Sequence, residues 1–317
     1  MYNIELGKTG LIVPTLAVGC MRINGLTKLE AERFINSAIE QGAYFFDHAD
    51  IYGRGECESQ FAESYGMTAE KREKILLQSK CGIVPGKMFD FSKEHIISSV
   101  EGSLKRLKTD YLDVLKRLHT DYLDILLLHR PDALMEPEEI AEAFTALKRS
   151  GKVRHFGVSN QSPGQVELIS RYLDMPIAAN QLQLSITNCT MIKAGLNVNM
   201  EIDPAVNRDG GVLDYCRLNG ITIQPWSPFQ YGFFEGTFID CEKFKPLNDC
   251  LEKIANKYGA DKTAVVIAWL LRHPARFQPV TGTMNEGRLK SCIRGTEIKL
   301  TREEWYEIYL SAGNKLP

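Results

Sequence analysis

The stretch that decides the fold is Tyr44-Phe45-Phe46-Asp47-His48-Ala49-Asp50-Ile51-Tyr52-Gly53, which opens as a buried strand and ends in polar groups. Its leading aromatic residues are typical of a strand anchored in a core. Asp47 and Tyr52 stand just beyond that anchor, where the chain leaves the strand. The stretch therefore predicts a core strand whose exit carries candidate functional groups.

The same strand-then-helix unit recurs along the chain. Short apolar runs predict strands at residues 16–20, 44–49, 75–79, 123–128, 153–158, 178–184, 221–226 and 277–280. Apolar residues at helical spacing predict helices at about 29–41, 56–65, from 92, 136–150, 165–173, 210–219, 244–258, 262–272, 285–293 and 301–312. Alternating units imply parallel strands, and eight such units indicate a closed barrel with its helices outside.

We therefore predict an α/β fold, a single (β/α)8 TIM barrel over residues 1–317, with an N-terminal β-hairpin at 4–14 and extra C-terminal helices. Length alone would also allow two ordinary domains, but no change of composition marks a linker between them. A doubly wound open sheet is the alternative. Such a sheet usually carries its phosphate loop after the first strand, and Gly19-Cys20-Met21-Arg22 is not a GxGxxG.

The composition is that of an ordinary globular protein, with 44% hydrophobic and 25% charged residues and a net charge of −2. No Lys/Arg-rich block calls for nucleic acid or an anionic membrane surface, and no signal peptide or membrane span is recognisable. The eight cysteines form no CxxC pair and suit neither a zinc site nor a disulfide framework. We expect reduced thiols, no metal and a cytoplasmic location.

Residues 104–114 and 115–125 form a tandem duplication in which nine of eleven positions are identical. A barrel needs only one helix end, one turn and one strand start here. The second copy must supply the strand, because it runs directly into the apolar residues 126–128. The first copy could lengthen the preceding helix by about 16 Å, which would displace Ile96 and Val100 from their packing site. We favour a bulge at the end of the barrel away from the active face, since doubling a loop costs only roughly 0.6 kcal/mol.

Titratable side chains follow three neighbouring strands. In a closed barrel the active face lies at the C-terminal ends of the strands. Asp47 and Tyr52 follow the second predicted strand, Lys80 the third and His129 the fourth. Taken alone, each has an ordinary explanation, as a helix cap, a packed aromatic, a solvated charge or the start of a loop. Together they are much harder to explain in that way.

These four groups suit the reduction of a carbonyl. A tyrosine with its reference pKa of about 10 is a poor acid at neutral pH, and a nearby ammonium such as Lys80 would lower that pKa. Asp47 would pair with Lys80, and His129 would hydrogen-bond the substrate oxygen. No side chain supplies a hydride, so a nicotinamide cofactor is implied.

Nearly the whole chain resembles the aldo-keto reductases, and most closely their bacterial oxidoreductase branch. The resemblance rests on Phe46-Asp47-His48-Ala49-Asp50-Ile51-Tyr52-Gly53, Gln78-Ser79-Lys80, Leu127-Leu128-His129-Arg130-Pro131-Asp132, Gly151-Lys152-Val153-Arg154-His155-Phe156-Gly157-Val158-Ser159-Asn160, Asn180-Gln181 and Trp226-Ser227-Pro228. It implies a (β/α)8 barrel, NADPH as cofactor, and reduction of aldehydes or ketones. It assigns Tyr52 as proton donor, with Asp47, Lys80 and His129 completing a catalytic tetrad.

The resemblance also implies a set of cofactor contacts. These are Ser159, Asn160 and Gln181 at the carboxamide, Trp226 stacked on the nicotinamide, Ser227 and Phe229 along the pyrophosphate, and Gly19, Met21 and Arg22 at the nicotinamide ribose. In the loop after the last strand, Thr283 and Arg288 match the family's pocket for the 2′-phosphate, but Gly282 stands where many relatives have lysine. Arg288 and the helix N-terminus beside it still favour an anion, so NADPH remains the expected cofactor.

Two other functions fit parts of the pattern. A Schiff-base lyase would use Lys80 as its nucleophile, although it would have no need of the dinucleotide contacts. A non-catalytic, nucleotide-sensing subunit would need the cofactor contacts but not the tetrad. We expect the residues that select the substrate to lie in the loops at 185–208 and 229–243, where aromatic residues suggest an apolar lid.

Overall fold

The computed structural model describes residues 1–107 and 122–317. Its centre is a closed barrel of eight parallel strands in the order β10-β11-β14-β3-β4-β5-β8-β9. The strands are β3 (Ala17–Gly19), β4 (Phe45–Asp47), β5 (Leu76–Cys81), β8 (Leu123–Leu128), β9 (Val153–Ser159), β10 (Ile177–Gln183), β11 (Thr222–Trp226) and β14 (Val280–Thr281). The predicted (β/α)8 barrel is therefore confirmed, and the open sheet is excluded because β14 pairs with β3 to close the ring.

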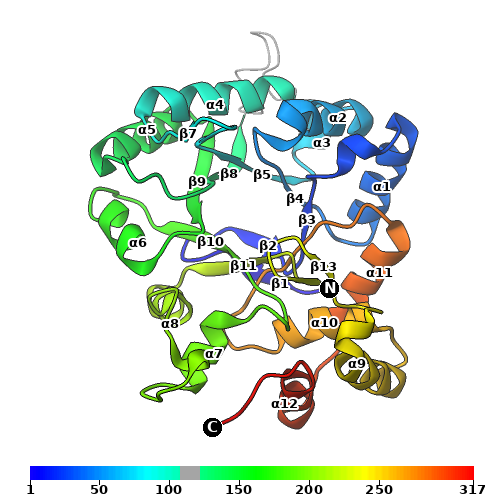
Figure 1. The fold of residues 1–317 in the computed structure, drawn as a ribbon. Coiled ribbons are helices and arrows are strands. Elements are labelled where there is room, and N and C mark those ends of the chain that lie inside the picture. Colours follow the sequence, from blue (N-terminus) through cyan, green and yellow to red (C-terminus); the bar gives the residue numbers. More distant parts are fainter. Residues whose placement is uncertain (108–121) are drawn as a thin grey trace.

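Helices surround the barrel on its outside (Figure 1). They are α1 (Lys28–Glu40), α2 (Glu56–Tyr65), α3 (Ala69–Arg72), α4 (Lys93–Arg106), α5 (Pro137–Arg149), α6 (Pro163–Ser170), α7 (Thr190–Leu196), α8 (Val212–Asn219), α9 (Lys245–Tyr258), α10 (Lys262–Leu271), α11 (Glu286–Gly295) and α12 (Arg302–Ser311). Several begin at side-chain caps that the local sequence supplies, as at Thr27, Ser162 and Thr301, where a Glu or Gln three residues later completes a capping box. The short helix α7 was not predicted.

Three two-stranded hairpins accompany the barrel. They are β1 (Asn3–Glu5) with β2 (Ile12–Pro14), β6 (Ile83–Val84) with β7 (Met88–Phe89), and β12 (Gln230–Tyr231) with β13 (Gly236–Thr237). Only the first of these was predicted.

The N-terminal hairpin closes the end of the barrel where the strands begin. Its residues Leu6 and Val13 are fully buried in one cluster with the barrel residues Phe45 and Ile125. The turn fits closely because Gly7 adopts a left-handed conformation, with φ of 59°, and a Cβ there would lie 2.5 Å from the carbonyl oxygen of Ala178. The opposite end, where the strands finish, stays open for a site.

The second copy of the duplication supplies the strand β8, as predicted. Helix α4 ends at Arg106, and Ile96 and Val100 remain fully buried against the barrel. The bulge that we favoured for the remainder of the repeat lies outside the described residues.

Candidate active site

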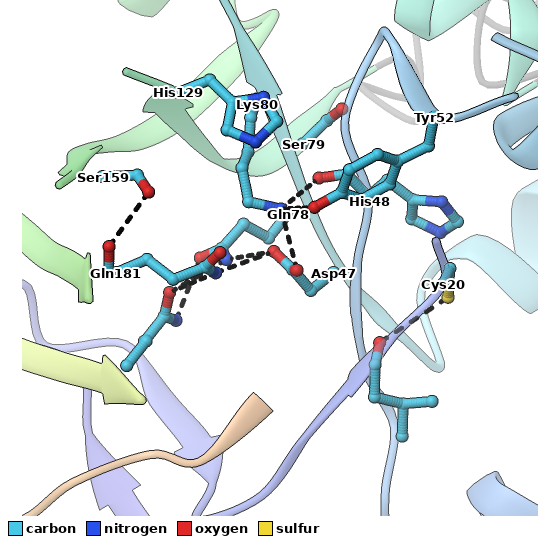
Figure 2. A network of polar contacts seen from close by, with 12 residues as sticks. Cys20, Asp47, His48, Tyr52, Gln78, Ser79, Lys80, His129, Ser159 and Gln181 are labelled. Atoms are coloured by element: carbon cyan, nitrogen blue, oxygen red, sulfur yellow. Dashed lines mark hydrogen bonds and ion pairs between the residues drawn. The ribbon is translucent and has the colours of Figure 1, made fainter. Parts of the chain in front are cut away.

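The predicted tetrad comes together at the C-terminal end of the barrel (Figure 2). Asp47 is the last residue of β4, Lys80 lies near the end of β5, and His129 follows β8. Tyr52 follows β4 on a short 3₁₀ turn and reaches back over the mouth of the barrel. Parallel strands present their C-terminal ends on one side, which is why residues far apart in the chain meet here.

Lys80 is fully buried, and its amine has three hydrogen-bond acceptors. Nζ lies 2.8 Å from Asp47 Oδ2, 2.6 Å from the carbonyl oxygen of His48 and 3.2 Å from the Tyr52 hydroxyl. The sequence predicts that Lys80 pairs with Asp47 and lies near Tyr52, and these distances agree with both expectations. Burial alone would lower the pKa of Lys80, but the Asp47 carboxylate and Tyr52 together raise it above its ordinary value, so the amine is an ammonium ion.

The pKa of Tyr52 corrects the expectation drawn from the sequence. The loss of water around its hydroxyl is the largest effect, and it raises the pKa above the ordinary value of 10. The Lys80 ammonium lowers the pKa as predicted, but it only limits this rise, and the Asp47 charge acts against it. Tyr52 is therefore protonated at neutral pH and holds a proton that it can donate.

His129 is a neutral imidazole. Burial, followed by the charges of Lys80 and Arg130, lowers its pKa well below the ordinary 6.5. Its ring stands edge-on to Tyr52, with ring centroids 5.8 Å apart. A neutral imidazole carries one N–H, so His129 can donate a hydrogen bond beside the tyrosine hydroxyl.

A cavity of about 910 Å³ opens over these residues. Asp47, Tyr52 and His129 line its inner end, whereas Lys80 lies beneath the surface. All of the predicted cofactor residues line the same cavity, namely Gly19, Met21, Arg22, Ser159, Asn160, Gln181, Trp226, Ser227, Phe229, Gly282, Thr283 and Arg288. The cavity thus runs without a break from the tetrad to the N-terminus of α11.

Two of these lining residues have a strained backbone. Asn160 and Ser227 have φ of 59° and 52°, in the left-handed region that favours glycine. Each directly follows a barrel strand, and each turns the chain sharply at the cavity wall. Asn160 Oδ1 also accepts from Trp226 Nε1 at 3.2 Å, which ties the two strand ends together. Strain of this kind is typical of functional sites.

Arg22 occupies the space that a side chain at position 282 would enter. Its Nη1 donates to the carbonyl of Gly282 at 3.2 Å, and a Cβ on Gly282 would lie 2.8 Å from the same nitrogen. Across this pocket Asn285 caps α11, its Oδ1 accepting from the backbone N–H of Arg288 at 2.9 Å. Two guanidinium groups and a helix N-terminus therefore surround the pocket, which suits a phosphate.

The sequence reasoning missed Arg130 as a cavity residue. Its guanidinium lies 5.7 Å from the centre of the Trp226 ring, on which Phe234 stacks with centroids 5.8 Å apart. Arg130 directly follows His129, so its place after a strand was the available signal. Phe234 belongs to the expected aromatic lid and lines the cavity, whereas Phe238 is fully buried and anchors the loop in the core.

Within residues 1–107 and 122–317 no cluster of three His, Cys, Asp or Glu side chains could hold a metal. All eight cysteines are free thiols, and burial raises the pKa of most of them. In the described part of the chain no helix is both long and apolar enough to cross a membrane.

Comparison with known proteins agrees with the barrel fold. The model of the Aldo/keto reductase family matches residues 15–116 and 114–309, and the two matches meet inside the duplicated segment. The oxidoreductase YcsN of Bacillus subtilis (strain 168) is 36% identical over 305 residues, covering 92% of this chain and 91% of that protein. The 6-dehydroglucose reductase of Agrobacterium fabrum is 32% identical over 291 residues, covering 89% of this chain and 87% of that protein.

Among solved structures, that of a thermostable aldo-keto reductase in complex with the inhibitor epalrestat superposes with a TM-score of 0.76 and 28% identity, covering 98% of this chain and 100% of that one. The chain belongs to the aldo/keto reductase family. Membership of this family makes it an NADP(H)-dependent oxidoreductase.

Proposed function

We propose that the protein reduces aldehyde or ketone carbonyls to alcohols with NADPH, and that Tyr52 donates the proton. The observation that carries this proposal is the Tyr52 hydroxyl, which lies 3.2 Å from the Lys80 ammonium and faces the same cavity as the predicted cofactor residues. A substrate oxygen between Tyr52 and His129 would meet two hydrogen-bond donors at once.

NADPH, when bound, supplies the hydride that reaches the carbonyl carbon. His129 donates a hydrogen bond that orients the carbonyl oxygen. Tyr52 transfers its proton to that oxygen as negative charge develops there, and the Lys80 ammonium stabilises the phenolate that remains. Asp47 balances the Lys80 charge in the buried site, and a proton from water restores Tyr52 after the alcohol leaves.

The cofactor residues divide along the cavity. Ser159, Asn160 and Gln181 lie beside the tetrad and would hold the carboxamide, with the Trp226 ring next to them. Arg22, Thr283 and Arg288 would hold the phosphate at the far end, where Arg22 fills the space above Gly282.

The contacts of Lys80 argue against a Schiff-base lyase. A lysine nucleophile must be a neutral amine with access to substrate. Lys80 is fully buried, its amine is held by three acceptors, and its pKa is raised. Trapping of a carbonyl substrate on Lys80 by borohydride would favour the lyase instead.

The test is an NADPH-oxidation assay on a panel of aromatic aldehydes, diketones and 6-dehydroglucose, the last because a relative is named for its reduction. We expect turnover of at least one class, and a fall in kcat of roughly 10²–10⁴-fold for Tyr52→Phe with the Kd for NADPH within about twofold of wild type. Equal activity in Tyr52→Phe would exclude Tyr52 as the donor. Tight NADPH binding without turnover of any carbonyl would support a nucleotide-sensing subunit.

A further inference from the structure

A chain of buried glutamines runs through the interior of the barrel beneath Asp47. Gln78 lies on β5, Gln224 on β11 and Gln278 just before β14, and all three side chains are fully buried. Gln78 and Gln224 form an amide pair, with Nε2 to Oε1 distances of 3.0 Å and 3.1 Å in the two directions. Gln224 Nε2 also donates to Gln278 Oε1 at 2.8 Å, and Gln278 Nε2 donates to the carbonyl of Pro14 at 2.7 Å.

The upper end of this chain is the catalytic carboxylate. Gln78 Nε2 donates to Asp47 Oδ1 at 2.6 Å. A dashed line in Figure 2 marks this hydrogen bond. Gln181, which lines the cofactor cavity, donates to the same oxygen at 3.2 Å and to Gln224 Oε1 at 3.2 Å. Asp47 Oδ2 is left for Lys80, at 2.8 Å.

The orientation of each glutamine amide follows from the hydrogen bond between Gln278 and Pro14. A backbone carbonyl can only accept, so Gln278 must turn its Nε2 towards Pro14 and its Oε1 towards Gln224. Gln224 must then use its Nε2 hydrogens for Gln278 and Gln78. Gln78 in turn has an N–H left for Asp47. The amide donors of Gln78 and Gln181 on Oδ1 and the Lys80 amine on Oδ2 together fix the orientation of the Asp47 carboxyl group.

We propose that Gln78, Gln224 and Gln278 are positioning residues that hold the Asp47 side chain facing Lys80, through amide hydrogen bonds anchored on the N-terminal hairpin. The proposal rests on the catalytic role proposed above for Asp47, Lys80 and Tyr52. None of the three glutamines lines the cavity, so each acts only through its neighbour in the chain. A fully satisfied buried network of this kind is rigid, and a single break leaves amide groups unpaired along it.

Gln278 offers a matched pair of variants at the end remote from the cofactor. Gln278→Met has a similar length and flexibility but removes both the donor to Pro14 and the acceptor for Gln224. Gln278→Glu, with its carboxyl group neutral, can still donate one O–H to Pro14 and accept from Gln224. Gln78→Met removes the direct donor to Asp47.

The measurements are kcat and KM for a carbonyl that the wild type reduces, the Kd for NADPH by fluorescence titration, and thermal unfolding. We expect Gln78→Met to lower kcat roughly tenfold or more, because small misplacements of a reacting group can cost up to about 10²-fold. Gln278→Met is expected to lower kcat about threefold to tenfold, and Gln278→Glu to recover most of that loss. The Kd for NADPH should stay within about twofold throughout, because the residues that line the cofactor cavity are unchanged.

The recovery in Gln278→Glu should itself depend on pH. As the pH rises and the introduced carboxyl group ionises, it loses the hydrogen that it donates to Pro14, and kcat should fall while the wild-type kcat does not. This fall of kcat with rising pH tests the proposal even where a Met variant does not fold. A pH profile of Gln278→Glu that matches the wild type would overturn the proposal, as would folded Met variants with kcat within about twofold of wild type. Failure of the proposed function would show differently, as a wild type that reduces no carbonyl.

Discussion

Two buried ion pairs lie at opposite ends of the same barrel, and they differ in what surrounds them. At the C-terminal end of the strands, Lys80 Nζ lies 2.8 Å from Asp47 Oδ2. At the N-terminal end, Arg72 Nη2 lies 2.7 Å from Asp124 Oδ2. None of the four side chains is more than 3% exposed, so burial alone does not distinguish the two pairs.

The hydrogen bonds of the Arg72 pair to its surroundings are mostly with backbone groups, which do not titrate. Its guanidinium donates to the carbonyls of Tyr122 and Ile75 at 2.8 Å and 2.9 Å, and Asp124 accepts from the backbone N–H of Leu77 at 2.9 Å. Arginine also keeps its proton under all ordinary conditions. This pair joins α3 to β8 and can only hold structure.

The Lys80 pair has one partner that can change its protonation state. Of the three acceptors around Nζ, the Tyr52 hydroxyl carries a proton and lines the cavity. In the proposed mechanism, the Lys80 pair is distinguished by the exchangeable Tyr52 proton beside the cavity, whereas burial and charge are common to both pairs.

The largest expected effect is the loss of activity in Lys80→Met. Without the ammonium, the Tyr52 phenolate loses the cation that is hydrogen-bonded to its oxygen, and we expect kcat to fall roughly 10²–10⁴-fold. The Kd for NADPH should change little, because Lys80 does not line the cavity. Steady-state assays with fluorescence titration of NADPH provide the measurement. Retention of more than about a tenth of wild-type kcat would remove the distinction between the two pairs.

Arg72→Met should affect stability instead. It leaves the buried Asp124 carboxylate with only the half-exposed Arg154 as a cation. We expect the free energy of unfolding to fall by about 3–5 kcal/mol, with kcat per folded molecule within about threefold of wild type. The matched control is Arg154→Met, since Arg154 lies 3.5 Å from the same carboxylate but is 48% exposed. The control should cost no more than about 1 kcal/mol. Equal losses in urea denaturation of the two variants would contradict this assignment.

Asp50 is a partly buried carboxyl group that tests what happens without a paired cation. Among the described residues no cation lies within ion-pair range of it. Burial is the main cause that raises its pKa to about 7, and the negative charge of Glu58 adds to the rise, whereas the positive charge of Arg106 opposes it. Below about pH 4 the group is protonated whether the chain is folded or unfolded. As the pH rises towards 7, the unfolded chain ionises first, so the wild type loses up to roughly 1.4 kcal/mol of stability per pH unit from this group.

Asp50→Asn cannot ionise and escapes this loss. Its stability relative to wild type should therefore improve steadily between about pH 4 and pH 7 and then stay constant. Burial lowers the pKa of His48 to about 3, with Lys80 adding to the effect, and this group acts with the opposite sign. It is present in both proteins and cancels in the difference. A difference that does not change with pH in urea denaturation would refute the assignment.

The smallest effect is expected from deletion of residues 108–118, which removes one copy of the duplication and keeps Tyr122 and Asp124. Both ion pairs keep all of their partners, so the free energy of unfolding should change by less than about 1 kcal/mol. The kcat and the Kd for NADPH should stay within about twofold. A large loss of activity on deletion would show that the duplication has a function of its own.

The polar residues at the strand ends were predictable from the sequence, but the hydrogen bonds inside the barrel were not. Asp47, Lys80 and His129 each follow an apolar run, and the C-terminal ends of parallel strands must meet, so the tetrad followed from the order of elements. Gln78, Gln224 and Gln278 gave only a weak signal, a single amide in or beside each of three short strands. Their hydrogen bonds join residues 54 and 146 positions apart in the sequence. Whether two such amides meet depends on the register between the strands.

The net pKa of Tyr52 was likewise out of reach of the sequence. Lys80 was identifiable as the neighbour that lowers this pKa, but the larger contribution is the loss of water around the hydroxyl. Burial of one atom depends on side chains from several strands and loops. No local pattern encodes that arrangement.

The duplication shows most clearly what the sequence determines and what only the tertiary structure determines. The sequence by itself determined that the second copy becomes a strand, because only that copy runs into Leu126-Leu127-Leu128, and it determined the barrel through the alternation of its elements. The copies carry equivalent residues at Asp113 and Asp124, so residue identity did not reveal which one pairs with Arg72. Only the tertiary structure decided for Asp124, because an ion pair forms where strand pairing and helix packing bring two charged atoms within contact distance.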